Sequence, residues 1–191
     1  MQGTEISEQA STINAALGKK SLILVGLMGA GKTTIGKRLA TRLGINFVDA
    51  DAEIEKAAGS TIADIFKDFG ETHFREGERR VIARLLDEGP QVLATGGGAF
   101  MDPDTRAAIA DKGISIWLKA DLDVLMKRVM RRTHRPLLQT ENPEAVMRGL
   151  IDTRYPTYAQ AALTIISKEG PHDAVVDDIE EALLALLPVS R

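Results

Sequence analysis

Five short runs of aliphatic residues punctuate the chain. None of them alternates cleanly between apolar and polar positions, and continuous apolar character over a few residues is typical of strands buried on both faces of a parallel sheet. The runs occupy residues 21–26 (SLILVG), 45–49 (INFVD), 91–95 (QVLAT), 114–119 (ISIWLK) and 162–167 (ALTIIS). We therefore expect five buried strands.

Helical patterns lie between these runs. Ile35, Leu39 and Leu43 recur one turn apart, and similar apolar stripes occur within 124–129 and 179–186. Strands that alternate with helices predict right-handed βαβ units. The expected fold class is therefore α/β, a three-layer α/β/α sandwich with a central five-stranded parallel sheet. Ligands of such sheets bind at the carboxyl ends of the strands, so the residues after each run are the candidates for function.

The composition fits one globular domain and excludes several kinds of site. Of the 191 residues, 44% are hydrophobic and 27% are charged, which is ordinary for such a domain. The net charge of −3 gives no reason to expect nucleic acid or an anionic membrane as a partner. The absence of cysteine excludes disulfides, thiolate metal sites and thiol catalysis.

The first twenty residues differ in character from the rest. They lack the basic start and the apolar block of a secretory signal, and the longest apolar runs of the chain are far too short to span a bilayer. We expect residues 1–20 to form a mobile polar extension with a helical turn near residues 13–17. Residues 21–191 should form a single domain, and the expected location is cytoplasmic.

A glycine-rich loop follows the first predicted strand. Residues 26–34 read GLMGAGKTT and fit the pattern G-x-x-x-x-G-K-[ST]. Glycines let consecutive backbone N–H groups turn toward phosphate oxygens, and the helix that should begin near Lys32 adds its positive N-terminal end. In this pattern the lysine reaches the β- and γ-phosphates, and the hydroxyl of Thr33 binds Mg²⁺. The position between a strand and an amphipathic helix favours a nucleotide-phosphate site over a chance glycine-rich turn.

Two carboxylates follow the second predicted strand. Asp49 and Asp51 stand two residues apart in FVDAD, where they could form a solvated turn, a metal site or a catalytic base. The third strand offers no aspartate for Mg²⁺, and Asp121, just beyond the fourth, has the position of a helix N-cap. Asp49 and Asp51 are therefore the acids best placed to meet the metal ion and the transferred phosphoryl group.

Three consecutive glycines, Gly96, Gly97 and Gly98, follow the third predicted strand. They could form a plain turn or a stretch of backbone that a ligand approaches closely. Four candidate arginines are scattered between residues 75 and 154, and each alone would be an ordinary surface residue. Together with the glycines they indicate a pocket for a small anionic acceptor. These arginines are Arg75, Arg132, Arg135 and Arg154.

Several separated motifs resemble those of the shikimate kinase family, which belongs to the nucleoside-monophosphate-kinase-like P-loop proteins. In order they are GLMGAGKTT, FVDAD, FGETHFRxxE, TGGG, RTHRPLL and TRYPTY, and the resemblance covers nearly all of residues 20–188. It implies transfer of the γ-phosphoryl group of ATP to the 3-hydroxyl of shikimate, a step of chorismate and aromatic amino-acid synthesis. It also implies Mg²⁺ as the cofactor, a monomer, an acceptor-binding segment at about 50–80 and a small lid at about 131–142.

The resemblance assigns roles to individual residues. Asp51 would bind the reacting hydroxyl as a base or as an orienting group, and Arg75 and Arg154 would clamp the carboxylate of shikimate. Lys32 and the lid residue Arg135 would stabilise charge on the transferred group. The remaining matches are Gly29, Ala30, Gly31, Lys32, Thr33, Thr34, Arg132 and Arg135 for ATP, Thr33 and Asp49 for the metal, and Gly96, Gly97, Gly98, Phe66 and Phe74 for shikimate. For the two phenylalanines, a role in the core fits their spacing equally well.

Alternative functions remain open on sequence grounds. The same scaffold could phosphorylate another small hydroxy acid such as gluconate, or a nucleoside monophosphate. A nucleotide-dependent regulatory switch is the alternative from another class, although the guanine-reading segment N-K-x-D is absent. The three histidines, His73, His134 and His172, are too scattered to suggest a metal site, and we expect them to be incidental.

Overall fold

The structure is a computed structural model that describes residues 7–131 and 140–188. The strands are β1 (Ser21–Val25), β2 (Asn46–Asp49), β3 (Gln91–Ala94), β4 (Gly113–Lys119) and β5 (Leu163–Ile166). The helices are α1 (Glu8–Leu17), α2 (Lys32–Leu43), α3 (Ala50–Ala58), α4 (Ile62–Asp87), η1 (Ala99–Met101), α5 (Pro103–Lys112), α6 (Leu122–Val129), α7 (Pro143–Tyr158) and α8 (His172–Leu186). Each of the five predicted strands is present, and no end differs from the predicted one by more than one residue.

The five strands form one parallel sheet in the order β2-β3-β1-β4-β5. In the central strand, Leu24 pairs with Ala94 of β3 on one side and with Ile116 of β4 on the other. Every residue of β1 and β3 is buried. The predicted five-stranded parallel sheet is confirmed. The prediction that all five strands are buried is wrong for β2 and β5, which are only partly buried because they lie at the two edges of the sheet.

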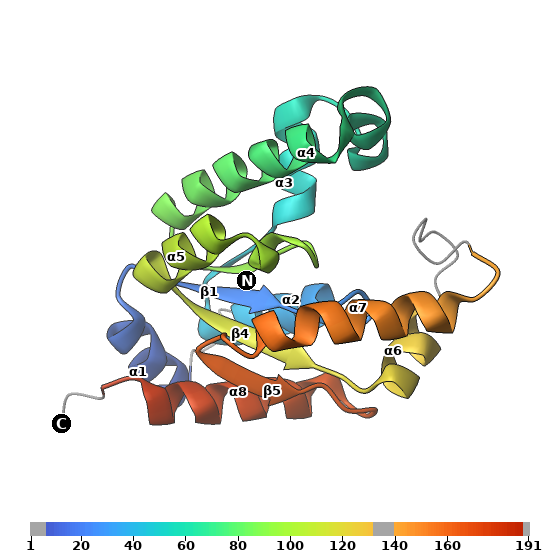
Figure 1. The fold of residues 1–191 in the computed structure, drawn as a ribbon. Helices are drawn as coiled ribbons and strands as arrows, with labels where there is room; N and C mark the ends of the chain where they lie inside the picture. Colours follow the sequence, from blue (N-terminus) through green and yellow to red (C-terminus); the bar gives the residue numbers. More distant parts are fainter. Residues whose placement is uncertain (1–6, 132–139, 189–191) are drawn as a thin grey trace, which may run out of the picture.

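The helices cover the two faces of the sheet in separate groups (Figure 1). α1 and α8 lie below the sheet in Figure 1 and α2 contacts both of them, whereas α4 and α5 pack on each other above it. α7 packs against β4, where the ring of Tyr155 meets that of Trp117 edge-on at a centroid distance of 4.9 Å. The result is the predicted three-layer sandwich.

The prediction of a mobile polar extension is wrong for residues 8–17, which form α1. The hydroxyl of Ser7 caps this helix by accepting a hydrogen bond from the Ala10 backbone N–H. Ala10, Ile13 and Leu17 lie on one face and are buried against the rest of the core, and α1 contacts α2 and α8. Only two large apolar side chains mark this face, which makes its periodicity weak in the sequence.

The segment predicted to bind the acceptor, at about 50–80, contains α3 and most of α4. α4 bends at Gly70, whose backbone angles (φ 83°, ψ 175°) are not helical. Most of the predicted lid, including Arg132 and Arg135, lies outside the described residues. Within residues 7–131 and 140–188, no helix combines the length and apolar character needed to cross a membrane.

Candidate active site

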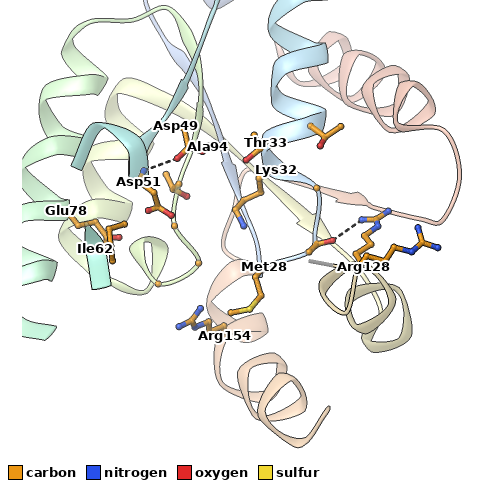
Figure 2. A pocket seen from close by; sticks show the side chains of 18 of the residues that line it. Met28, Lys32, Thr33, Asp49, Asp51, Ile62, Glu78, Ala94, Arg128 and Arg154 are labelled. Atoms are coloured by element: carbon orange, nitrogen blue, oxygen red, sulfur yellow. Dashed lines mark hydrogen bonds between the residues drawn. The ribbon is translucent and has the colours of Figure 1, made fainter. Parts of the chain in front are cut away.

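A pocket of about 710 Å³ opens at the carboxyl ends of β1, β2 and β3. Figure 2 shows Asp51 and Glu78 on one side, Arg128 on the opposite side, and Lys32 and Thr33 between them. The sequence-predicted residues that line the pocket are Gly29, Gly31, Lys32, Thr33, Thr34, Asp49, Asp51, Phe66, Phe74, Arg75, Gly96, Gly97, Gly98 and Arg154. Residues from distant parts of the chain thus meet in one cavity at the carboxyl ends of the strands, where ligands of such sheets bind.

The phosphate loop has the backbone that its glycines predict. Gly29 and Gly31 have φ values of 83° and 96°, which other residues rarely adopt, and Gly31 is the N-cap of α2. The Nζ of Lys32 donates hydrogen bonds to the carbonyl oxygens of Gly26 at 2.7 Å and Leu27 at 3.0 Å. Ala30, which was also predicted to bind ATP, is buried and does not line the pocket. Its backbone N–H donates a hydrogen bond to Leu27 O.

Asp49 and Asp51 have different roles in the local backbone. Asp49 ends β2 and is the N-cap of α3, because its Oδ1 accepts hydrogen bonds from the N–H groups of Asp51 at 2.9 Å and Ala52 at 3.4 Å. Asp51 lies in the first turn of α3 and faces the pocket. Burial raises the pKa of Asp51, the charge of Asp49 raises it further, and Lys32 opposes both effects.

The three glycines after β3 each lie against the side chain of a different predicted site residue. A Cβ built on Gly96 would come within 2.9 Å of Asp51 Oδ1, and one built on Gly97 would come within 2.7 Å of Arg154 Nη1. A Cβ on Gly98 would overlap the guanidinium of Arg75. Any larger residue would therefore displace a functional group.

Glu78 holds the guanidinium of Arg75 in place. Its Oε1 accepts a hydrogen bond from Arg75 Nη1 at 2.7 Å, and its side chain is only 5% exposed, against 29% for the arginine. Burial raises the pKa of Glu78, whereas the hydrogen bond and charge of Arg75 lower it. This hydrogen bond fixes the orientation of the Arg75 guanidinium, whose remaining N–H groups can bind a second carboxylate.

Comparison with known proteins decides the family. The family model for shikimate kinase matches residues 28–184. A shikimate kinase of Bradyrhizobium diazoefficiens is 61% identical over 175 residues, which are 92% of this chain and 84% of that protein. A shikimate kinase of Brucella canis is 53% identical over 184 residues, covering 96% and 92% of the two chains. The chain belongs to the shikimate kinase family.

A solved structure supports the same conclusion at the level of the fold. The shikimate kinase of Acinetobacter baumannii in complex with shikimate superposes with a TM-score of 0.84 at 39% identity, over 91% of this chain and 97% of that one. The predicted family, fold class and enzyme class are therefore confirmed. Members of the shikimate kinase family are ATP-dependent phosphotransferases that act on an alcohol group.

Tyr158 is a pocket-supporting residue that the sequence analysis missed, although it lies in the TRYPTY motif. Its side chain is fully buried, and its hydroxyl donates a hydrogen bond to the carbonyl oxygen of Gly97. Burial raises its pKa, and the nearby charge of Arg154 lowers it. One turn separates the two residues on α7, so Tyr158 fixes the helix that carries Arg154 to the glycine run.

The two phenylalanines differ in burial. Phe66 and Phe74 line the pocket with ring centroids 4.6 Å apart. Phe74 is 5% exposed and belongs to the hydrophobic core, whereas Phe66 is 37% exposed. Asp121 occupies the N-cap position of α6 as predicted, but its side chain makes no capping hydrogen bond.

The end of the pocket near α6 contains residues that the sequence analysis did not select. They are Met28, Lys127, Arg128, Arg131, Glu169, Gly170 and His172. His172 was expected to be incidental, yet it lines the pocket, and burial together with Arg128 and Arg38 lowers its pKa. The sequence could have indicated this position, because His172 begins the helix that follows the carboxyl end of the fifth strand.

Proposed function

We propose that this pocket binds the triphosphate of ATP at the phosphate loop and binds shikimate beside the glycine run, and that the γ-phosphoryl group passes to the 3-hydroxyl. The observation that carries the proposal is the contact of Gly96, Gly97 and Gly98 with Asp51, Arg154 and Arg75, respectively. One carboxylate beside two guanidinium groups suits an acceptor that has both a hydroxyl and a carboxylate.

The phosphate side of the site supplies positive charge and positioning. Lys32 and the N–H groups of the loop would bind the phosphate oxygens, so that the Nζ exchanges its bonds to Gly26 O and Leu27 O for bonds to ATP. Arg135 of the lid stays a predicted contributor, because it lies outside the described residues. Arg132 stays predicted beside adenine for the same reason.

The acceptor side of the site positions the reacting oxygen. Arg75 and Arg154 would bind the carboxylate of shikimate, and the backbone of the glycine run would contact the ring hydroxyls. Asp51 would accept a hydrogen bond from the 3-hydroxyl and receive its proton as the new oxygen–phosphorus bond forms. The bond from the γ-phosphorus to the bridging oxygen breaks in the same transfer, and ADP leaves.

A Mg²⁺ ion fits the oxygen donors on the phosphate side. Among the described residues, no group of three or more acidic, histidine or cysteine side chains could hold a metal ion by itself. Mg²⁺ in kinases is usually held by one or two protein carboxylates together with water and phosphate. Thr33 and Asp49 are the residues that would hold it, Asp49 through the oxygen that does not cap α3. When bound, the ion would neutralise charge on the β- and γ-phosphates.

Measuring ADP release from ATP and Mg²⁺ with a panel of acceptors tests the proposal. Shikimate should support rapid release, its methyl ester should show a raised KM because the carboxylate charge is gone, and gluconate and a nucleoside monophosphate should be poor acceptors. Equal rates with gluconate would contradict the assigned acceptor. Hydrolysis of GTP without acceptor, and no turnover of shikimate, would support a regulatory switch instead.

A further inference from the structure

Tyr158 lies one turn after Arg154 on α7, so the two side chains share one face of the helix. The ring of Tyr158 is fully buried, and its hydroxyl donates a hydrogen bond to the carbonyl oxygen of Gly97. We propose that Tyr158 is a positioning residue for the acceptor, which holds the guanidinium of Arg154 beside the glycine run and leaves the charge of that guanidinium uncompensated. The inference rests on the proposed function, in which Arg154 binds the carboxylate of shikimate.

The hydroxyl of Tyr158 and the guanidinium of Arg154 meet at Gly97. A Cβ built on Gly97 would come within 2.7 Å of Arg154 Nη1 and 3.6 Å of Tyr158 Oη. The hydroxyl donates its only proton to Gly97 O, so its oxygen can accept a hydrogen bond from a neighbouring N–H group. Burial raises the pKa of Tyr158, whereas the charge of Arg154 and a hydrogen bond from it lower this pKa. The phenol oxygen is therefore placed to hold this guanidinium.

The ring of Tyr158 is itself held by other aromatic residues. Its centroid lies 5.9 Å from that of Trp117 in β4 and 6.5 Å from that of Phe100 in η1, and both of these rings are buried. Phe100 comes two residues after the glycine run, so Tyr158 is joined to this segment by its ring as well as by its hydroxyl. Core packing thus sets the position of the hydroxyl before any acceptor binds.

The two arginines assigned to the acceptor carboxylate differ in the charge of their partners. Arg75 forms an ion pair with the buried carboxylate of Glu78 at 2.7 Å. Within residues 7–131 and 140–188, no carboxylate forms an ion pair with Arg154, and Tyr158 is a neutral partner. A carboxylate offsets the positive charge of an arginine, whereas a phenol only orients it. Arg154 therefore supplies the net positive charge, and Figure 2 shows it directed toward the part of the pocket that contains Asp51 and Glu78.

Kinetics with two acceptors test the inference. Tyr158→Phe removes the oxygen and keeps the ring, so the KM for shikimate should rise about fivefold or more while the KM for ATP stays within about twofold. The methyl ester of shikimate has no carboxylate charge, so its KM should change by less than about twofold in the same variant. The preference for the acid over the ester should therefore fall. A purely structural role of Tyr158 would affect both acceptors equally.

Tyr155→Phe is the matched control. Tyr155 lies on the same helix, and its hydroxyl also donates to a backbone carbonyl oxygen, but this is the oxygen of Ala120, which follows β4 rather than the glycine run. The control variant should lower thermal stability through the loss of this hydrogen bond. The KM values for shikimate and for its ester should both stay unchanged.

A double-mutant cycle checks that Tyr158 acts through Arg154. Arg154→Met should raise the KM for shikimate about tenfold or more and remove most of the preference for the acid. In that background, Tyr158→Phe should add less than about twofold, because the group that it positions is already gone. ITC with shikimate in the presence of ADP should show the same pattern in the Kd.

Three outcomes overturn the inference. They are an unchanged KM for shikimate in Tyr158→Phe, equal increases in the KM for the acid and for the ester, and independent effects of the two substitutions in the double variant. Arg154→Met separates this failure from failure of the assigned acceptor site. If Arg154→Met raises the KM for shikimate and Tyr158→Phe does not, only the role of Tyr158 is wrong. If neither variant raises it, the acceptor site itself is misassigned.

Discussion

The guanidinium of Arg75 lies directly against the backbone of Gly98, so that a Cβ on the glycine would come within 2.6 Å of Nη1 and would also overlap Nη2. The same guanidinium donates a hydrogen bond from Nη1 to Glu78 Oε1 at 2.7 Å. The guanidinium of Arg75 therefore lies in contact with both the backbone of Gly98 and the buried carboxylate of Glu78. Arg75 can keep this position only because residue 98 has no side chain.

Gly98→Ala should weaken shikimate binding selectively. The backbone at Gly98 (φ −90°, ψ −13°) suits alanine, so the methyl group should act only by pushing Arg75 aside. We expect the KM for shikimate to rise about tenfold and the KM for ATP to stay constant. Gly149→Ala is the control: nothing lies within 4 Å of a Cβ there, and alanine in α7 should add about 0.5–1 kcal/mol to stability without changing the kinetics. Equal kinetic effects of the two variants would contradict the steric argument.

Arg75→Lys tests the geometry of the clamp. Lysine keeps the charge but loses the planar fork that can bind Glu78 and a carboxylate together, so the KM for shikimate should rise by about 10- to 100-fold. Steady-state kinetics should show no change in the KM for ATP. Arg79→Lys is the matched control, because Arg79 lies one turn further along α4 and pairs with Asp102 at 2.7 Å outside the pocket. Normal shikimate kinetics in Arg75→Lys would make Arg75 an ordinary surface residue.

Asp51→Asn should lower activity and raise stability. Loss of the base or orienting group should reduce kcat by about 10²- to 10⁴-fold while ATP still binds. The amide also removes a buried negative charge that Asp49 repels, so the free energy of unfolding at neutral pH should increase, by about 0.5–2 kcal/mol as for other stabilising substitutions. Urea unfolding and ITC with ADP measure the two effects. Normal turnover, or a loss of stability, would contradict this account.

The pKa of Asp51 makes a separate prediction about pH. Because burial and Asp49 raise this pKa above 3.8 in the native state, the folded protein holds the proton more tightly than the unfolded chain does. The contribution of Asp51 to the free energy of unfolding should therefore decrease as pH rises from 3.8 through the native pKa. Carboxyl NMR titration of the nucleotide-free protein should show the raised pKa. Asp49→Asn should lower it, and a pKa that does not move would refute the repulsion between the two acids.

Ile13→Ala should show that α1 belongs to the folded domain. Ile13 is fully buried, so its truncation should cost about 2–5 kcal/mol of unfolding free energy. The exposed neighbour Ser11 provides the control, since Ser11→Ala should change stability by less than about 0.5 kcal/mol. Both variants should keep normal kinetics at temperatures where they are folded. Equal melting temperatures would mean that α1 contributes little to the fold.

The sequence predicted the sheet well because buried parallel strands leave an unmistakable apolar run. SLILV is buried at every position, and its short length and the glycine-rich loop after it favour a strand over a buried helix. The segment around Ile13 was misjudged for the opposite reason. Its burial depends on the surfaces of α2 and α8, which come from elsewhere in the chain.

The residues of the candidate site could be predicted where the chemistry requires a particular residue type at a fixed position in a sequence motif. Lys32 and Thr33 follow from the phosphate loop, and Asp49 and Asp51 from the end of a strand. Arg128 could not be found in this way. Its partners are the carbonyl groups of the loop and of Lys168, which have no sequence signature, and they become its neighbours only through folding.

The capping bond of Asp49 has a consequence for how the two halves of the reaction stay aligned. One oxygen of this carboxylate accepts a hydrogen bond from the N–H of Asp51, which leaves the other oxygen for the proposed Mg²⁺. On the proposed function, the distance between the Mg²⁺ and the acceptor oxygen would therefore be set within the three consecutive residues from Asp49 to Asp51. The bend of α4 at Gly70 lies outside this segment, so a change in the angle of that bend would leave the spacing of the two carboxylates as it is.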